Sequence, residues 1–103
     1  MKYKPKKESI IACDLDGTLC HNEGFTEEAC MFAKPNKEMI RKVNEFHRNE
    51  CFIIIYTARR EFLRFATEYW LKKNGVEYNI LDIGNKVWAD VYIDDRNVLL
   101  KDI

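Results

Sequence analysis

Acidic and hydroxyl side chains end three separate apolar segments of this sequence. Asp14 and Asp16 follow one apolar run, and Thr57 ends a second. Asp94 and Asp95 end a third. Carboxylate oxygens bind hard divalent cations, and a hydroxyl can donate a hydrogen bond to an anion. These residue types indicate a site for a cation and an anionic ligand, provided that the fold brings the three segment ends together.

The segments that must position these residues alternate between strand and helix patterns. The first two strands are apolar on both faces, which is typical of a parallel sheet, and the carboxyl ends of parallel strands meet at one edge. The stretch Gly17–Lys34 has no clear period and is predicted as a loop, with a small hairpin as an option. Strands are predicted over Ile10–Asp14, Cys51–Tyr56, Glu77–Leu81 and Val91–Asp94, with a short additional strand over Asn97–Leu100 as an option. Helices are predicted over Lys37–Asn49, with Asn36 as N-cap, and over Glu61–Lys73, ending at Asn74-Gly75.

Each predicted helix has an apolar face that should pack on the sheet. In the first helix, Met39, Val43 and Phe46 recur at helical spacing. In the second helix the predicted buried face combines aromatic and small residues. Its members are Phe62, Phe65, Ala66 and Tyr69, with Trp70 alongside. Trp70 and Trp88 are predicted to be packing residues rather than platforms for a substrate.

Composition limits the classes of protein that fit. The chain has 103 residues, of which 47% are hydrophobic, so it can bury one core. The formal net charge is zero, which disfavours bulk electrostatic binding of nucleic acid or of a membrane. No apolar run is long enough to span a membrane. The four cysteines have no zinc-type spacing, and Cys13 and Cys51 look like buried thiols, so a cytoplasmic setting is expected.

The spacing of the site residues resembles the signature motifs of the haloacid dehalogenase superfamily. The stretch "DLDGTL" is similar to the first motif, and "IIIYTARR" resembles the second, a strand that ends in Thr or Ser. Lys86 takes the place of the third-motif lysine, and "VYIDDR" resembles the fourth motif. The resemblance implies a three-layer Rossmann-like α/β fold with a mainly parallel central sheet. It implies one domain over residues 1–103, of which 1–8 form a basic N-terminal segment.

The same resemblance implies a Mg²⁺-dependent phosphomonoester hydrolase that works through an aspartyl-phosphate intermediate. Asp14 is the expected nucleophile and a metal ligand. Asp16 is expected to give the metal its backbone carbonyl and to transfer the leaving-group proton through its side chain. Asp94 is expected to bind the metal directly, and Asp95 directly or through water. An acid at position 16 also points to a phosphatase or phosphotransferase rather than a carbon–halogen hydrolase.

The remaining roles concern the phosphoryl group. The resemblance implies that the Thr57 hydroxyl binds a phosphoryl oxygen, together with the backbone N–H groups of Leu15 and Ala58. Lys86 would neutralise the charge shared by nucleophile and phosphate, although a solvated surface lysine is the alternative. Arg59 is a candidate for holding an anionic part of the substrate.

Several neighbouring residues keep two readings open. Arg59, Arg60 and His21 lie just past the motifs, and each is either a substrate contact or an exposed loop or helix-start residue. Asp90 either orients Lys86 or caps a turn.

Only Cys20–Pro35 and Glu61–Asn85 separate the motifs, so no cap domain fits and the site should be open. Within the superfamily the chain resembles small capless proteins assigned to capsule or surface-polysaccharide synthesis, through "KPNKEMI", "YTARR" and "ADVYIDDR". That resemblance favours a sugar phosphate, or a similar small phosphorylated metabolite, as substrate. A 5′-nucleotidase or nucleic-acid end phosphatase and a non-catalytic phospho-ligand-binding module are the alternatives. An edge strand left open makes a homo-oligomer an option.

Overall fold

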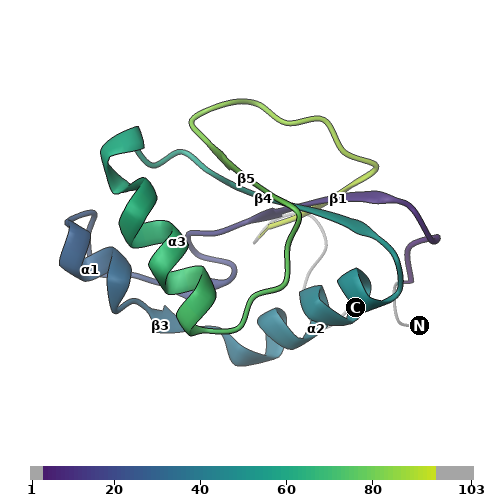
Figure 1. Ribbon diagram of the computed structural model, residues 1–103, viewed down its shortest axis with the longest axis horizontal. Helices are drawn as coiled ribbons and strands as arrows, with labels where there is room; N and C mark the ends of the chain where they lie inside the picture. Colours follow the sequence, from purple (N-terminus) through teal and green to yellow (C-terminus); the bar gives the residue numbers. More distant parts are fainter. Residues whose placement is uncertain (1–3, 95–103) are drawn as a thin grey trace.

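A four-stranded parallel sheet forms the centre of the computed structural model, which describes residues 4–94 (Figure 1). Its strand order is β5-β4-β1-β6, and β2 and β3 form a separate antiparallel pair. The elements in chain order are β1 (Ile10–Asp14), β2 (Cys20–His21), α1 (Glu27–Met31), β3 (Lys34–Pro35), α2 (Lys37–Arg48), β4 (Phe52–Thr57), the 3₁₀ turn η1 (Glu61–Leu63), α3 (Arg64–Lys73), β5 (Ile80–Ile83) and β6 (Val91–Ile93). The expected mixed α/β fold with a mainly parallel central sheet is confirmed.

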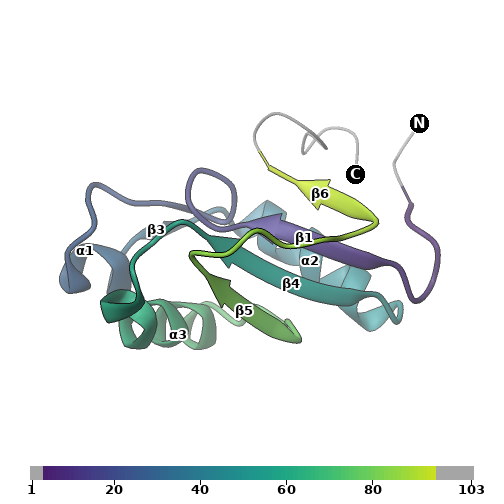
Figure 2. The same cartoon turned by 90° about the horizontal axis from the view of Figure 1, so that it is seen from above.

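The two long helices cover the same face of the sheet. Figures 1 and 2 show α2 and α3 on one side, while the 84–90 loop rises on the other side. The core between helices and sheet is apolar and includes Ile11, Ile53, Val43 and Trp70. Burial of such side chains is the main stabilising term, at about 25 cal/mol per Å² of apolar surface. No helix in the described range 4–94 combines the length and the apolar character needed to cross a membrane.

Most of the predicted elements are present with small shifts of their ends. The predicted helix over residues 61–73 divides into η1 and α3, and the predicted strand over residues 77–81 lies instead at Ile80–Ile83. The 17–34 stretch holds the short strands β2 and β3, as the hairpin option allowed, and also the helix α1, which was not predicted. The optional strand over residues 97–100 lies outside the described residues.

The predicted buried face of the helix over residues 61–73 is wrong for its exposed aromatic residues and confirmed for Ala66 and Trp70. Phe62, Phe65 and Tyr69 are exposed, and the buried side is made by the residues Leu63, Ala66, Thr67, Trp70 and Leu71. The physical reason is a polar contact that hydrophobic spacing cannot reveal. Thr67 Oγ1 donates to the Leu63 carbonyl and accepts from Arg59, so a threonine occupies the inner side of the helix.

The two tryptophans and Asp90 differ in burial and contacts. Trp70 is buried and its Nε1 donates to the Ala33 carbonyl, which confirms a packing role. Trp88 is 69% exposed, so its predicted packing role is wrong within the described chain. Asp90 has a contact that was not predicted, because its Oδ2 accepts a 2.6 Å hydrogen bond from the backbone N–H of Ile10 and so anchors the start of β1.

Candidate functional site

The carboxyl ends of β1 and β6 bring Asp14 and Asp94 to one edge of the sheet. Cys13 pairs with Ile93 in the parallel register, so the next residue on each strand is one of these two carboxylates. Burial raises the pKa of the Tyr56 phenol, and the negative charges of Asp14 and Asp94 raise it further. Both carboxylates therefore lie close enough to influence the same side chain. The structure places Asp14 and Asp94 together, whereas Asp95 falls outside the described residues.

The turn after β1 is closed by backbone hydrogen bonds. Leu15 N donates to the Tyr56 carbonyl over 3.1 Å, and Gly17 N donates to the Cys20 carbonyl over 2.9 Å. Gly17 has φ of +84°, a conformation in which a Cβ would be strained, so the Asp-Gly sequence is required by the turn itself. The Leu15 N–H, expected to face a phosphoryl group, is used here to join β1 to β4.

The Asp16 carboxylate is held by Arg59 and Thr57. Arg59 Nη2 lies 2.8 Å from Oδ1, and Nε lies 3.1 and 3.2 Å from the two carboxylate oxygens. Thr57 Oγ1 donates to Oδ2 over 2.8 Å. These are donors to an acceptor-only group, so the arrangement suits an ionised carboxylate. The Thr57 hydroxyl, expected to bind phosphate, is therefore directed at Asp16.

Arg59 is almost completely buried, although the residue was expected either to bind substrate or to lie exposed in a loop. Its side chain is 1% exposed, against 23% for the side chain of Asp16. The third donor, Nη1, reaches Thr67 Oγ1 at 2.9 Å on α3. The guanidinium thus joins the turn after β1 to α3. No periodic pattern marked this connection, because it joins two polar side chains, and Asp16 is 43 positions away from Arg59.

Three other candidate residues are exposed. Lys86 is exposed in the loop between β5 and β6. Within residues 4–94, no hydrogen bond or ion pair joins it to the carboxylates, so the charge-neutralising role stays a prediction. His21 and Arg60 are both exposed.

A pocket of about 510 Å³ opens over the two carboxylates that follow β1. Its polar lining comes from Asp14, Asp16 and the two arginines. Its apolar lining includes two aromatic residues that sequence reasoning missed. The lining residues are Asp14, Asp16, Phe25, Ala58, Arg59, Arg60, Phe62 and Leu63. Hydrophobic spacing had assigned Phe62 to the core, and nothing in the sequence marked Phe25.

The donor set bears on the expected Mg²⁺. Across residues 4–94, no group of three or more His, Cys, Asp or Glu side chains forms a metal cluster. Mg²⁺ is commonly bound by one or two carboxylates with water completing the shell. Asp14 and Asp94 meet that smaller requirement, and a main-chain carbonyl such as that of Asp16 is a suitable hard ligand. The described residues therefore fit a magnesium ion.

The two cysteines nearest the site are poor nucleophiles. Burial raises the pKa of the Cys20 thiol to about 12, and the Asp16 carboxylate contributes to the increase. Burial also raises the pKa of Cys13, with Asp14 and Asp94 as further causes. A neutral thiol is unreactive toward electrophiles. The chemistry at this edge therefore belongs to the carboxylates.

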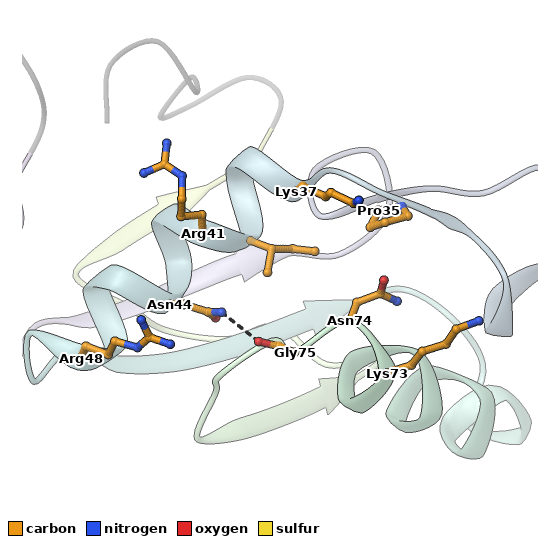
Figure 3. Close-up of a pocket in the computed structure, with 9 residues that line it drawn as sticks. Pro35, Lys37, Arg41, Asn44, Arg48, Lys73, Asn74 and Gly75 are labelled. Carbon is orange, nitrogen blue, oxygen red and sulfur yellow. Dashed lines mark hydrogen bonds between the residues drawn. The ribbon is translucent and has the colours of Figure 1, made fainter.

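A second pocket of about 570 Å³ lies between α2 and the end of α3 (Figure 3). Its charged lining is basic, from Lys37, Arg41, Arg48 and Lys73. Arg48 is bound to Glu77 at 2.6 Å, and Asn44 donates to the Gly75 carbonyl at 2.8 Å. The described lining contains no carboxylate, so this pocket lacks the groups needed for metal binding or nucleophilic attack.

Comparison with known proteins adds a structural likeness. No protein-family model and no curated protein matches the chain. A Vibrio cholerae target protein is similar over 90% of this chain and 85% of its own, with 27% identity and a TM-score of 0.66. A conserved Bacteroides thetaiotaomicron protein covers 89% and 79%, with 24% identity and a TM-score of 0.67.

A chain of the Pnkp1/Rnl/Hen1 complex is similar over 81% of this chain, with 21% identity and a TM-score of 0.69. This chain spans only 30% of that chain's length. The likenesses support the fold that the motifs implied, that of haloacid dehalogenase-like proteins.

Proposed function

We propose that this chain is a phosphomonoester hydrolase. The observation that carries the proposal is the position of Asp14, which lies beside Asp94 at the carboxyl edge of the sheet and lines an open pocket. The haloacid dehalogenase-like fold supports a phosphatase-type function. The reaction follows from the residue types at this edge.

In the proposed reaction a carboxylate oxygen of Asp14 forms a bond to phosphorus as the ester P–O bond breaks. The leaving oxygen takes a proton from Asp16, which enters this step as the neutral acid after taking up a proton from solvent, and departs as an alcohol. Water then attacks the aspartyl-phosphate, gives a proton to Asp16 and releases inorganic phosphate. Asp16 must leave its contacts with Arg59 and Thr57 to carry a proton, so a rotation of its side chain belongs to the cycle.

Positive charge is required beside the nucleophile. Two like unit charges about 4 Å apart cost about 4 kcal/mol at an effective dielectric of 20, and a phosphate dianion roughly doubles that figure. Mg²⁺, held by Asp14, Asp94 and the Asp16 carbonyl, would supply most of the compensation. Asp95 and Lys86 remain the proposed additional contributors from the sequence.

The leaving group is proposed from the sequence. The sequence favours a sugar phosphate, with a nucleotide as alternative. Because the chain is similar in structure to a chain from an RNA repair complex, the phosphorylated end of a nucleic acid is a further alternative substrate. A non-catalytic phospho-ligand-binding module is the alternative from another class.

The test is hydrolysis of p-nitrophenyl phosphate with Mg²⁺ or with EDTA. We expect turnover that EDTA abolishes and that Asp14→Asn lowers by about 10⁴-fold or more, since removal of a nucleophile leaves little residual catalysis. The matched control is Asp82→Asn, the same substitution on a carboxylate that does not line the pocket and bonds to Asn85. A folded wild-type protein that binds Mg²⁺ by calorimetry without turnover would favour the binding module.

A further inference from the structure

The pocket over Asp14 is lined by two phenyl rings as well as by carboxylates. Phe25 and Phe62 line it while remaining 57% and 64% exposed. Exposed apolar side chains that border a pocket indicate a binding surface, whereas single exposed apolar side chains elsewhere are common in proteins. Phe65 is 72% exposed and lies outside the pocket, so exposure alone is not the argument.

The two aromatic residues come from distant segments that the fold brings to one pocket. Phe25 precedes α1, and Phe62 lies in η1, which leads into α3. Packing between α1 and α3 joins these segments, with Cys30, Leu63 and Ala66 forming a small buried cluster. Leu63 belongs both to this cluster and to the pocket lining. The segments that carry Phe25 and Phe62 are therefore held by buried packing.

We propose that this pocket selects phosphomonoesters whose leaving group carries a planar aromatic base, that is, nucleotides rather than simple sugar phosphates. The inference rests on the proposed function. A simple sugar phosphate has no aromatic face, so it gains no stacking of a base on these phenyl rings. A nucleobase has an aromatic face, and stacking on aromatic side chains is worth about 1–3 kcal/mol per base. The carboxylates, with a bound cation, would take the phosphate, and the phenyl rings that line the same pocket would take the base.

The experiment compares AMP with ribose 5-phosphate. Both esters have the same leaving oxygen, so they differ in the base rather than in the reactivity of the broken bond. We expect kcat/KM for AMP to exceed that for ribose 5-phosphate by about 10-fold or more, the lower part of the range that stacking allows. Equal values for the two esters would overturn the inference and leave the phosphatase proposal standing.

Variants locate the preference. Phe62→Ala and Phe25→Ala should each lower the AMP to ribose 5-phosphate ratio by about 5-fold or more, while Phe62→Tyr keeps it. The matched control Phe65→Ala removes an equally exposed ring outside the pocket, and it should leave both values unchanged. A Phe62→Ala variant that loses activity equally on both esters would indicate a structural role and contradict the inference.

Binding separates failure of this inference from failure of the phosphatase proposal. AMP and ribose 5-phosphate are titrated into Asp14→Asn protein with Mg²⁺ by calorimetry. Tighter binding of AMP without turnover by the wild type would support the nucleotide pocket and reject hydrolysis. Equal or absent binding of both ligands would reject the pocket. A dinucleotide with the same terminal phosphate distinguishes a free nucleotide from the end of a nucleic acid, according to whether its turnover matches that of AMP.

Discussion

The Asp16–Arg59 pair is the residue-scale feature with the largest expected effect on stability. A guanidinium can be buried when its nitrogens have hydrogen-bond partners. In Arg59, Nε and Nη2 donate to Asp16, and Nη1 donates to Thr67. Loss of one member of a buried pair leaves the other uncompensated, which typically costs about 3–5 kcal/mol. The partly accessible Asp16 lowers that figure, because water can solvate the remaining charge.

We therefore expect Arg59→Ala to lower the free energy of unfolding by about 2–4 kcal/mol in urea denaturation. Arg59→Lys should recover only part of the loss, because an ammonium cannot reproduce the forked contact with a carboxylate. The control is Arg60→Ala, which removes the adjacent exposed arginine and should change stability by about 0.5 kcal/mol or less. Equal stability of the two alanine variants would show that the buried pair contributes nothing.

The sequence predicted which residues stand at the sheet edge better than it predicted their contacts. Asp14 and Asp94 come together because strand ends are determined by local apolar patterning and parallel order. The attachment of Asp16 to Arg59 spans 43 positions and depends on a guanidinium that no periodic pattern marks. Contacts of that kind follow from packing of the whole chain.

At the scale of elements, Asn36 joins the turn after β1 to helix α2. Its Oδ1 accepts from Met39 N and caps the helix, as predicted. Its Nδ2 also donates to the Thr18 carbonyl at 3.1 Å, and its backbone N–H donates to the Leu19 carbonyl. One residue thus fixes both the helix start and the segment that follows the site carboxylates.

Two substitutions separate these contributions. Asn36→Ala removes the cap and the bond to Thr18, and we expect a loss of about 1–2 kcal/mol in the free energy of unfolding. Asn36→Asp keeps an acceptor at the cap but removes the Nδ2 donor, so it should cost about 1 kcal/mol or less. Urea unfolding followed by circular dichroism gives both values. If the aspartate variant is as unstable as the alanine variant, the bond to Thr18 dominates and capping is minor.

Element types were predictable where the periodic signal was strong. β1 has the predicted ends, and α2 begins where Asn36 indicated. The five-residue helix α1 was missed because it is too short to show an apolar period. Its N-cap Thr26 carries the usual hydrogen bond to Ala29 N, so the capping residue was the one available signal.

At the scale of the whole molecule, the buried thiols and the partly buried Tyr56 phenol make the free energy of unfolding depend on alkaline pH. Burial raises the pKa of Cys13, Cys20 and Tyr56 in the folded protein. A raised pKa for an acid favours its neutral form in the fold. The resulting stability is fully present below the thiol pKa of the unfolded chain, about 8.5. It declines as the pH rises above that value, because the unfolded chain then releases protons that the folded chain retains.

We expect the free energy of unfolding, measured in urea with a reducing agent, to fall between pH 8.5 and pH 10.5. Each buried thiol contributes up to about 1.4 kcal/mol per pH unit, so Cys20, with a folded pKa of about 12, remains effective throughout this interval. Cys20→Ala removes one such group. The variant should start less stable at pH 7.5, because a packed side chain is lost, and should then decline less steeply, by about 2 kcal/mol in total over the interval. Parallel plots of the free energy of unfolding against pH for wild type and variant would contradict this. They would mean that the Cys20 thiol ionises as easily in the folded protein as in the unfolded chain, and that burial does not shield it from water.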